Sequence, residues 1–103
     1  MTAWVYLVRC GDGSLYCGAT TNLVRRMGCH QRGQGAKYIR ARGFSGLAAQ
    51  WQVNSYPAAL RLECWLKTKS KPKKEAWVRE PAQFWQAVEQ TNVTAGLSGL
   101  GRD

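Results

Sequence analysis

Residues 3–20 read AWVYLVRCGDGSLYCGAT, two short apolar runs on either side of a turn signal. Residues 3–9 are rich in β-branched and aromatic types, which predicts a strand. A Gly-Asp-Gly-Ser turn follows, and residues 15–19 then predict the return strand of a hairpin. Tyr6 and Tyr16 lie in these two paired strands, so their phenols are neighbours if the side chains share a face.

A helical pattern follows the hairpin. Threonine and asparagine residues supply N-cap candidates for a helix over residues 23–31. Asn22, Arg26 and His30 recur at a spacing of four, which aligns them on one face of that helix. Residues 35–42 are either a second short helix or a basic loop.

The second half of the chain predicts one more strand and three helices. Residues 50–56 alternate well enough for a third strand. Pro57 then opens a helix that runs to about Lys67 with an apolar buried face. A lysine-rich stretch follows, and after it two short helices are expected over residues 73–79 and 82–91.

The composition is that of a single globular domain. The chain has 103 residues, of which 45% are hydrophobic, enough for one modest core. We expect a domain over residues 1–92 and a flexible, glycine-rich tail over residues 93–103. No apolar run approaches the ~20 residues that span a bilayer, and the apolar start lacks the basic region of a signal peptide.

Charge and cysteine usage narrow the class of protein. The formal net charge is +9, from 15 Lys and Arg against 6 Asp and Glu. Such a surplus favours a polyanionic partner, although charge alone is equally compatible with a protein that is merely basic. The four cysteines form no Cys-x-x-Cys pair, which argues against a zinc ribbon or a thioredoxin-type motif. We therefore expect four free thiols and a location in the reducing cytoplasm. There we expect the protein to associate with the nucleoid.

Taken together, the motifs resemble a GIY-YIG nuclease domain, and most closely its small stand-alone bacterial members. The residues that carry the resemblance are Val5-Tyr6, Tyr16-Cys17-Gly18, Asn22-Leu23-x-x-Arg26, His30, Gly35-Ala36-Lys37-Tyr38 and Glu63. Each piece is weak alone, but their order and spacing over residues 3–67 are specific. The resemblance implies an α/β (α+β) fold, with a small three-stranded antiparallel sheet flanked by helices. It also implies metal-dependent hydrolysis of DNA phosphodiesters.

Residue by residue, the resemblance implies catalytic roles for Tyr16, Arg26, His30 and Tyr6. Glu63 is then the metal ligand, for one Mg²⁺ or Mn²⁺ ion that binds weakly without substrate. We hypothesise that Tyr16 and His30 together form the base that takes a proton from the attacking water. The planar fork of Arg26 suits a phosphate.

Each of these residues also has a structural interpretation. Arg26 could be a solvated helix arginine, as we expect of its neighbour Arg25. Glu63 could be a surface residue that pairs with Lys67 one helical turn later. For Tyr6, a plain core position is the default for an aromatic residue in a hairpin.

The sequence departs from the family pattern at three positions. Trp4 replaces the glycine of the first motif and Cys17 the isoleucine of the second. Ala19 stands where several branches carry a lysine. Without that ammonium, one way of favouring a phenolate is missing, so slow turnover is expected.

Basic and aromatic residues outside the motifs are candidates for contacts with the DNA backbone. The candidate nucleic-acid-binding residues are Lys37, Tyr38, Arg40, Arg42, Lys69 and Lys71. A run of charge is usually only solvated, so these assignments depend on the resemblance. The five tryptophans are expected mostly in the core.

The sequence therefore predicts a metal-dependent DNA endonuclease that acts in DNA repair or on branched or nicked DNA. The alternatives are a catalytically weak or inactive nucleic-acid-binding module of the same fold, and a partner-binding adaptor. DNA is the expected partner, with no membrane contact. A separate protein partner for targeting is an open expectation, and the chain is expected to be a monomer or a weak dimer.

Overall fold

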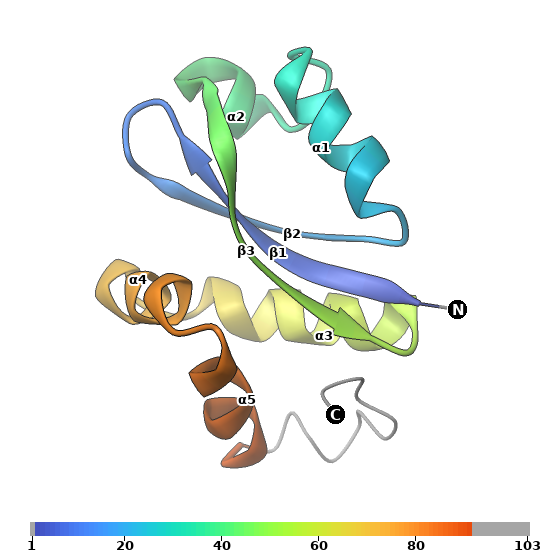
Figure 1. Ribbon diagram of the computed structural model, residues 1–103, viewed down its shortest axis with the longest axis vertical. Coiled ribbons are helices and arrows are strands. Elements are labelled where there is room, and N and C mark those ends of the chain that lie inside the picture. Colours follow the sequence, from blue (N-terminus) through green and yellow to red (C-terminus); the bar gives the residue numbers. More distant parts are fainter. Residues whose placement is uncertain (1, 92–103) are drawn as a thin grey trace.

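The computed structural model describes residues 2–91, in which a three-stranded sheet lies between two groups of helices (Figure 1). The strands are antiparallel in the order β2-β1-β3, with bounds β1 (Ala3–Cys10), β2 (Leu15–Thr20) and β3 (Phe44–Val53). The helices are α1 (Leu23–Gln31), α2 (Lys37–Arg42), α3 (Tyr56–Lys67), α4 (Lys71–Arg79) and α5 (Ala82–Glu89). This arrangement confirms the predicted α+β fold.

The β1–β2 hairpin forms as predicted. Gly13 has a φ of +86°, which its missing Cβ permits, and the Asp12 carboxylate accepts a hydrogen bond from the Ser14 backbone N–H at 3.0 Å. The register places Tyr6 opposite Gly18 and Val8 opposite Tyr16. Both tyrosines pack in the same cluster, so the phenols are neighbours.

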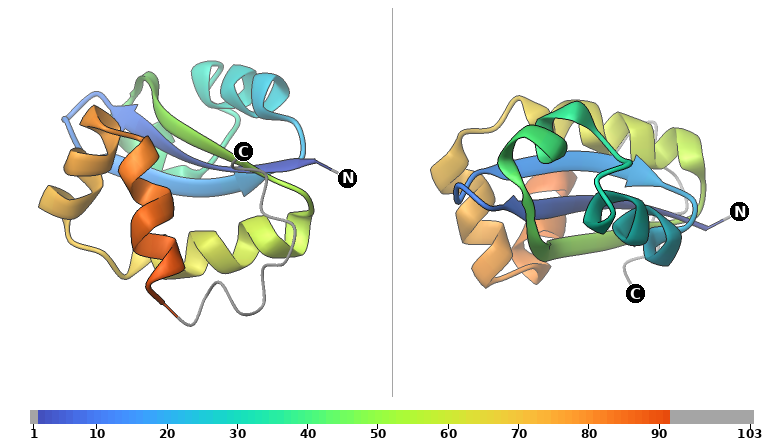
Figure 2. Two further views of the ribbon diagram at one scale, coloured as in Figure 1. Left: turned by 60° about the horizontal axis from the view of Figure 1, so that its bottom comes forward. Right: turned by 90° about the horizontal axis from the view of Figure 1, so that it is seen from above.

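Alternation along β1 divides the interior into two parts, one on each face of the sheet. Val5 and Leu7 pack into the larger core against α3, α4 and α5. Tyr6 and Val8 pack into the smaller cluster beneath α1 and α2. Figure 2 shows α1 and α2 alone on their face of the sheet. A period of two in one strand thus separates a hydrophobic face from a face with polar groups.

The large core is aromatic and deeply buried. Phe84 is fully buried and stacks on Trp51, with ring centroids 4.0 Å apart. Trp77 meets Phe84 edge-on, and both Trp51 and Trp77 are only 4% exposed. The expectation that the tryptophans belong mostly to the core is confirmed for these two.

The third strand is a correction to the sequence prediction. Residues 50–56 were predicted, whereas β3 begins at Phe44 and ends at Val53. Its first half contains serine, glycine and alanine residues with little strand preference, and its pairing with β1 shifts register twice. The predicted end of the strand at residue 56 is also wrong. Ser55 caps α3 by accepting a hydrogen bond from the Ala58 N–H, so Tyr56 already belongs to the helix.

The helices otherwise lie close to their predicted positions. The segment left open between helix and loop contains the six-residue α2. Helix α4 begins two residues earlier than predicted because Ser70 caps it and Pro72 fits its first turn. Helix α5 ends at Glu89 rather than at residue 91. The predicted tail over 93–103 lies outside the described residues.

Two further findings concern the chain as a whole. All four cysteines are free thiols, as expected. Among residues 2–91, no helix is long and apolar enough to cross a membrane.

Candidate active site

A buried phenol–imidazole pair lies at the centre of the smaller cluster. The Tyr6 hydroxyl and His30 Nε2 are 3.0 Å apart in a hydrogen bond, and the two residues are 1% and 2% exposed. The ring of Tyr6 lies over Gly18, where an added Cβ would overlap the phenol ring and hydroxyl. Residue 18 must therefore be glycine, because the ring of Tyr6 occupies the space that its side chain would need.

The surroundings keep both partners of this pair neutral. Burial raises the pKa of Tyr6 well above the usual value of a phenol. The charge of Arg26 opposes that increase, whereas Tyr16 and Glu63 add to it. Burial also lowers the pKa of His30, and the positive charge of Arg26 lowers it further. At neutral pH the pair is thus a phenol and an uncharged imidazole.

The second nitrogen of His30 is enclosed by the segment that follows α1. His30 Nδ1 is buried without a hydrogen-bond partner among the described residues. A Cβ on Gly35 would overlap this nitrogen, so only glycine lets the backbone pass so close to the imidazole. The ring of Phe44 stacks on the imidazole, with centroids 6.3 Å apart. Gly35 was known from the sequence only as a motif residue, and its contact with His30 is visible only in three dimensions.

Tyr16 meets the same imidazole from the neighbouring strand. Its ring is half-buried and edge-on to His30, with centroids 6.0 Å apart. It also lies 5.8 Å from the ring of Tyr38 on α2. The expected pairing of Tyr16 with His30 is therefore a ring contact, because the hydrogen bond of the imidazole goes to Tyr6. No hydrogen bond within residues 2–91 engages the Tyr16 hydroxyl.

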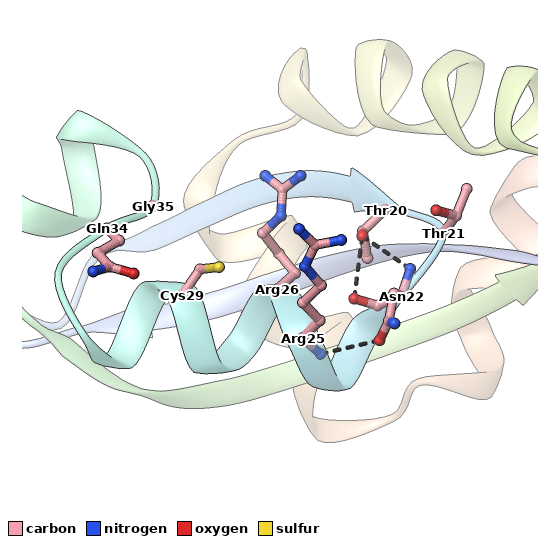
Figure 3. Close-up of a pocket in the computed structure, with 8 residues that line it drawn as sticks. All are labelled: Thr20, Thr21, Asn22, Arg25, Arg26, Cys29, Gln34 and Gly35. Carbon is pink, nitrogen blue, oxygen red and sulfur yellow. Dashed lines mark hydrogen bonds between the residues drawn. The ribbon is translucent and has the colours of Figure 1, made fainter.

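Arg26 extends from α1 across strand β2 (Figure 3). Its side chain is exposed and lines a pocket of about 380 Å³ beside the helix (Figure 3). The expected alignment with Asn22 and His30 holds only in part. Asn22 is the N-cap, whose side chain accepts a hydrogen bond from the Arg25 N–H, and His30 turns inward to Tyr6. Arg25, which sequence reasoning treated as merely solvated, lines the same pocket.

Glu63 lies on α3, on the other side of the sheet from α1. Its carboxylate Oε2 is 3.0 Å from Lys67 Nζ, so the helix ion pair considered as an alternative does form. Glu63 is nevertheless only 17% exposed, and its charge acts on Tyr6. The pKa of Lys67 is raised by its hydrogen bond with Glu63 and also by the neighbouring Tyr16. Glu63 is therefore paired with Lys67 and still acts electrostatically on the phenol of Tyr6.

The donor set around Glu63 can be compared with the needs of a divalent cation. No group of three histidine, cysteine or acidic residues that could hold a metal occurs in the part of the chain that the structure describes. Mg²⁺ keeps several waters and binds through one or two carboxylates together with substrate phosphates. A single, partly exposed carboxylate such as Glu63 fits that ion, and it would not hold a zinc ion.

The candidate DNA-binding residues fall into two groups on opposite faces of the sheet. Lys37, Tyr38, Arg40 and Arg42 lie on α2, and Tyr38 contacts Tyr16. The Arg42 guanidinium stacks 3.8 Å above the Tyr38 ring centroid and forms an ion pair with Asp12. It therefore connects α2 to the hairpin turn.

The other two candidates lie near the start of α4. Lys69 Nζ is 4.8 Å from the centroid of the Trp65 ring, and Lys71 Nζ is 3.8 Å from Glu75. Both cations are thus engaged within the protein. The structure does not bring them together with the α2 group.

Ala19, the position without the family lysine, points away from the phenols. It is 8% exposed and belongs to the large core, opposite Val5. A cation from α3 is near instead, since Tyr16 raises the pKa of Lys67.

The order of these residues along the chain can be compared with known proteins. Residues 2–76 match the sequence model of the GIY-YIG catalytic domain. The chain belongs to the GIY-YIG family. The match includes both tyrosines, Arg26, His30 and Glu63, so this GIY-YIG domain has the fold of a nuclease superfamily.

Relatives of this GIY-YIG protein are small bacterial proteins. A UPF0213 protein of Streptococcus sanguinis is 44% identical over 81 residues, which cover 79% of this chain and 93% of the relative. A UPF0213 protein of Vibrio cholerae is 44% identical over 86 residues, 81% of this chain and 83% of the relative. The solution NMR structure of the UPF0213 protein BH0048 from Bacillus halodurans is 45% identical. It matches with a TM-score of 0.49 and covers 77% of this chain and 84% of that one.

Proposed function

We propose that this GIY-YIG protein is a metal-dependent DNA endonuclease. The observation that carries the proposal is that Arg26, Tyr16 and Glu63 all act electrostatically on one buried phenol, Tyr6, which is hydrogen-bonded to His30. These groups come from three elements, α1, the β-hairpin and α3. A cation for phosphate, a hydroxyl for water and a carboxylate for a metal are what phosphodiester hydrolysis requires.

Tyr16 is the residue best placed to take a proton from water. Tyr6 is deeply buried and its raised pKa keeps it a phenol. Tyr16 is half-buried, and its hydroxyl has no hydrogen-bond partner among the described residues. The ammonium of Lys67, whose pKa Tyr16 raises, is a positive charge near this phenol.

Tyr6 and His30 are positioning residues in this scheme. Their hydrogen bond and the walls formed by Gly18 and Gly35 hold the imidazole in place. The edge-to-face contact with the imidazole in turn orients the ring of Tyr16. Because His30 is neutral, it adds no positive charge that would compete with Arg26 for the phosphate.

Arg26 would bind the non-bridging oxygens of the scissile phosphate. A guanidinium gives two parallel hydrogen bonds to such oxygens, and the charge that develops on them during attack strengthens both bonds. Glu63 would hold a Mg²⁺ or Mn²⁺ ion, which neutralises charge on the phosphate and the leaving oxygen when bound. Lys67 must then share the carboxylate or release it.

A non-catalytic nucleic-acid-binding module is the second candidate, and the Glu63–Lys67 ion pair favours it. In that case Glu63 serves only the helix, and the basic surface binds DNA without cutting it. A pair of this kind on a helix contributes only about 0.3–0.5 kcal/mol to stability.

The first test is a nicking assay on supercoiled plasmid with Mg²⁺ or Mn²⁺, with EDTA as the blank. We expect Tyr16→Phe to abolish cleavage and to leave DNA binding nearly intact. Tyr56→Phe removes another phenol that acts on Tyr6 but lies exposed on α3, and it shows whether loss of any neighbouring phenol has the same effect. Cleavage by the Tyr16 variant at the wild-type rate would refute the assignment of the base.

The second test separates the two candidate functions. Glu63→Gln should remove metal-dependent cleavage and change the free energy of unfolding by less than about 0.5 kcal/mol. Glu80→Gln, an exposed carboxylate beyond α4, should change neither quantity. Unchanged cleavage by the Glu63 variant would leave only the ion-pair role for this residue.

The preferred DNA structure can be measured by comparing the cleavage of different substrates. We propose repair intermediates as the substrates, because the candidate contacts are cations suited to backbone phosphates, which carry no sequence information. Cleavage of duplex, nicked, flap, fork and four-way junction substrates at equal concentration would rank them. Equal rates on all of them would contradict a preference for branched or nicked DNA.

A further inference from the structure

The pocket beside α1 extends past the groups already assigned to the reaction. Its lining runs from the turn at Thr20 and Thr21, along Arg25 and Arg26, to Gln34 and Gly35. Figure 3 shows the two arginines extending side by side from α1 into this space. No carboxylate lines it. A pocket with two cations and no acid is suited to an anion.

Both guanidinium groups are available. Neither Arg25 nor Arg26 forms an ion pair or a side-chain hydrogen bond with residues 2–91. Other arginines of this chain are engaged, since Arg9 binds Glu75 and Arg42 binds Asp12. Two neighbouring like charges without a counter-ion repel each other, and a phosphate between or beside them removes that cost.

The walls of the pocket are held by the protein itself. At one end the Thr20 hydroxyl accepts a hydrogen bond from the Asn22 N–H, and the Asn22 side chain accepts one from the Arg25 N–H. At the other end the Arg32 guanidinium donates to the Gln34 side-chain oxygen at 3.3 Å and to Cys29 Sγ at 3.6 Å. The Gln34 oxygen is thereby occupied, and its amide N–H groups remain to donate to a ligand.

We propose that Arg25 and this pocket bind a second backbone phosphate of the substrate strand, next to the phosphate bound by Arg26. The proposal rests on the nuclease function above and adds a subsite to it. The DNA strand crosses α1 from the Tyr16 side, so Arg26 holds the reacting phosphate and Arg25 holds a flanking one. An extended strand suits the site better than a free mononucleotide, because the lining places its two guanidinium groups next to each other along the helix.

The salt dependence of DNA binding tests this subsite without cleavage. The full chain and two variants, Arg25→Gln and Arg79→Gln, are titrated with labelled single-stranded and duplex oligonucleotides in EDTA between 50 and 200 mM KCl. Arg79 is exposed at the end of α4, and Arg79→Gln is the matched control because it also removes one positive charge. Arg25→Gln should lower the slope of log K against log[salt] by about 0.9 for duplex or about 0.7 for a single strand. Arg79→Gln should leave the slope unchanged, and equal slopes for the two variants would overturn the proposal.

A neutral-phosphate scan then locates the contact. One phosphate at a time is replaced by an uncharged methylphosphonate along the oligonucleotide. At one position the substitution should weaken binding of the wild-type protein and have no further effect on Arg25→Gln. If every position weakens both proteins equally, Arg25 contacts no phosphate. Competition by a nucleoside monophosphate at micromolar concentration, lost in the Arg25 variant, would assign the pocket to a free nucleotide instead and overturn the strand-binding proposal.

The outcomes distinguish this subsite from the nuclease proposal. If the wild-type chain never cuts DNA, the nuclease proposal fails, while the binding slopes still decide whether Arg25 contacts phosphate. Suppose instead that the wild-type chain cuts DNA while Arg25→Gln and Arg79→Gln have the same KM, the same salt dependence of binding and the same response to methylphosphonates. In that case only the subsite proposal fails. Equal thermal midpoints of the variants establish that folding is not the cause.

Discussion

The two faces of the sheet are built from alternate residues of the same strands and differ in kind. The face beneath α3, α4 and α5 is a continuous hydrophobic core with stacked aromatic rings. The face beneath α1 and α2 has a smaller cluster and contains the Tyr6–His30 pair. One face stabilises the fold, and the other holds neutral polar groups in a fixed geometry.

This difference explains where close packing is required. On the large face, shape is supplied by bulky side chains such as Phe84 and Trp51. On the small face, glycines provide the space, since Gly18 admits Tyr6 and Gly35 admits His30. Substitutions on the first face should therefore act on stability, and those on the second should act on stability and activity together.

The largest effect is expected from Phe84→Ala on the large face. Phe84 is fully buried and contacts four other aromatic rings. Its truncation should lower the free energy of unfolding by about 3–5 kcal/mol, measured by urea titration. DNA cleavage per folded molecule should be unchanged. A selective loss of activity in the folded variant would show that the two faces are not independent.

Gly18→Ala should have the next largest effect. The new methyl group would overlap Tyr6, which must then move from His30, at a cost of about 1–3 kcal/mol and with loss of cleavage. Gly46→Ala is the matched control, because a Cβ there meets nothing within 4 Å. Equal melting temperatures for the two variants would mean that the cluster adapts to the methyl group.

Tyr6→Phe probes the polar pair itself. Removing the hydroxyl leaves both nitrogens of the buried imidazole without a partner among residues 2–91. We expect a loss of about 1–2 kcal/mol in the free energy of unfolding, measured in denaturant. Tyr38→Phe removes a hydroxyl from the same side of the sheet at a half-exposed position and should be nearly neutral. A neutral Tyr6→Phe would indicate that the hydrogen bond contributes nothing to stability.

The smallest effect is a pH dependence of stability. His30 is the single histidine of the chain, and burial with the nearby charge of Arg26 lowers its pKa in the folded state. The unfolded chain therefore binds a proton more readily. The free energy of unfolding should fall as pH decreases from about 6.5 to the native pKa, by at most about 1.4 kcal/mol per pH unit, and level off below it.

Denaturant titrations between pH 7.5 and 5 measure this dependence. His30→Gln should lose the step in this range, because it removes the single histidine of the chain. A rise in stability on acidification would mean that the folded protein favours the imidazolium, and that Tyr6 acts as its acceptor.

Most of the secondary structure follows from local chemistry. The hairpin is predictable from the alternation of apolar residues and a glycine turn, and α1 from Asn22 as its cap. The start of β3 is not, because residues such as Gly46 and Ala48 have little strand preference and pair only because β1 lies beside them. Strand formation there depends on tertiary contacts.

The candidate site was predicted as a set of residues and not as a set of contacts. Sequence patterns identify Tyr6, Tyr16, Arg26, His30 and Glu63 through a family resemblance. They predict that His30 pairs with Tyr16, whereas its hydrogen bond in the structure is with Tyr6. They also treat Arg25 as solvated, since helix periodicity does not reveal a pocket wall built by the segment after the helix.

The amino-acid sequence by itself determined the elements of this protein, its basic surface and its family, because these depend on neighbouring residues and their order. Only the tertiary structure decided that Tyr6 pairs with His30, that two glycines make room for them, and that Arg25 joins Arg26 along one pocket. Contacts of this kind depend on strand register and on backbones that approach within the space of one methyl group. Such distances are set by the packing of the whole fold.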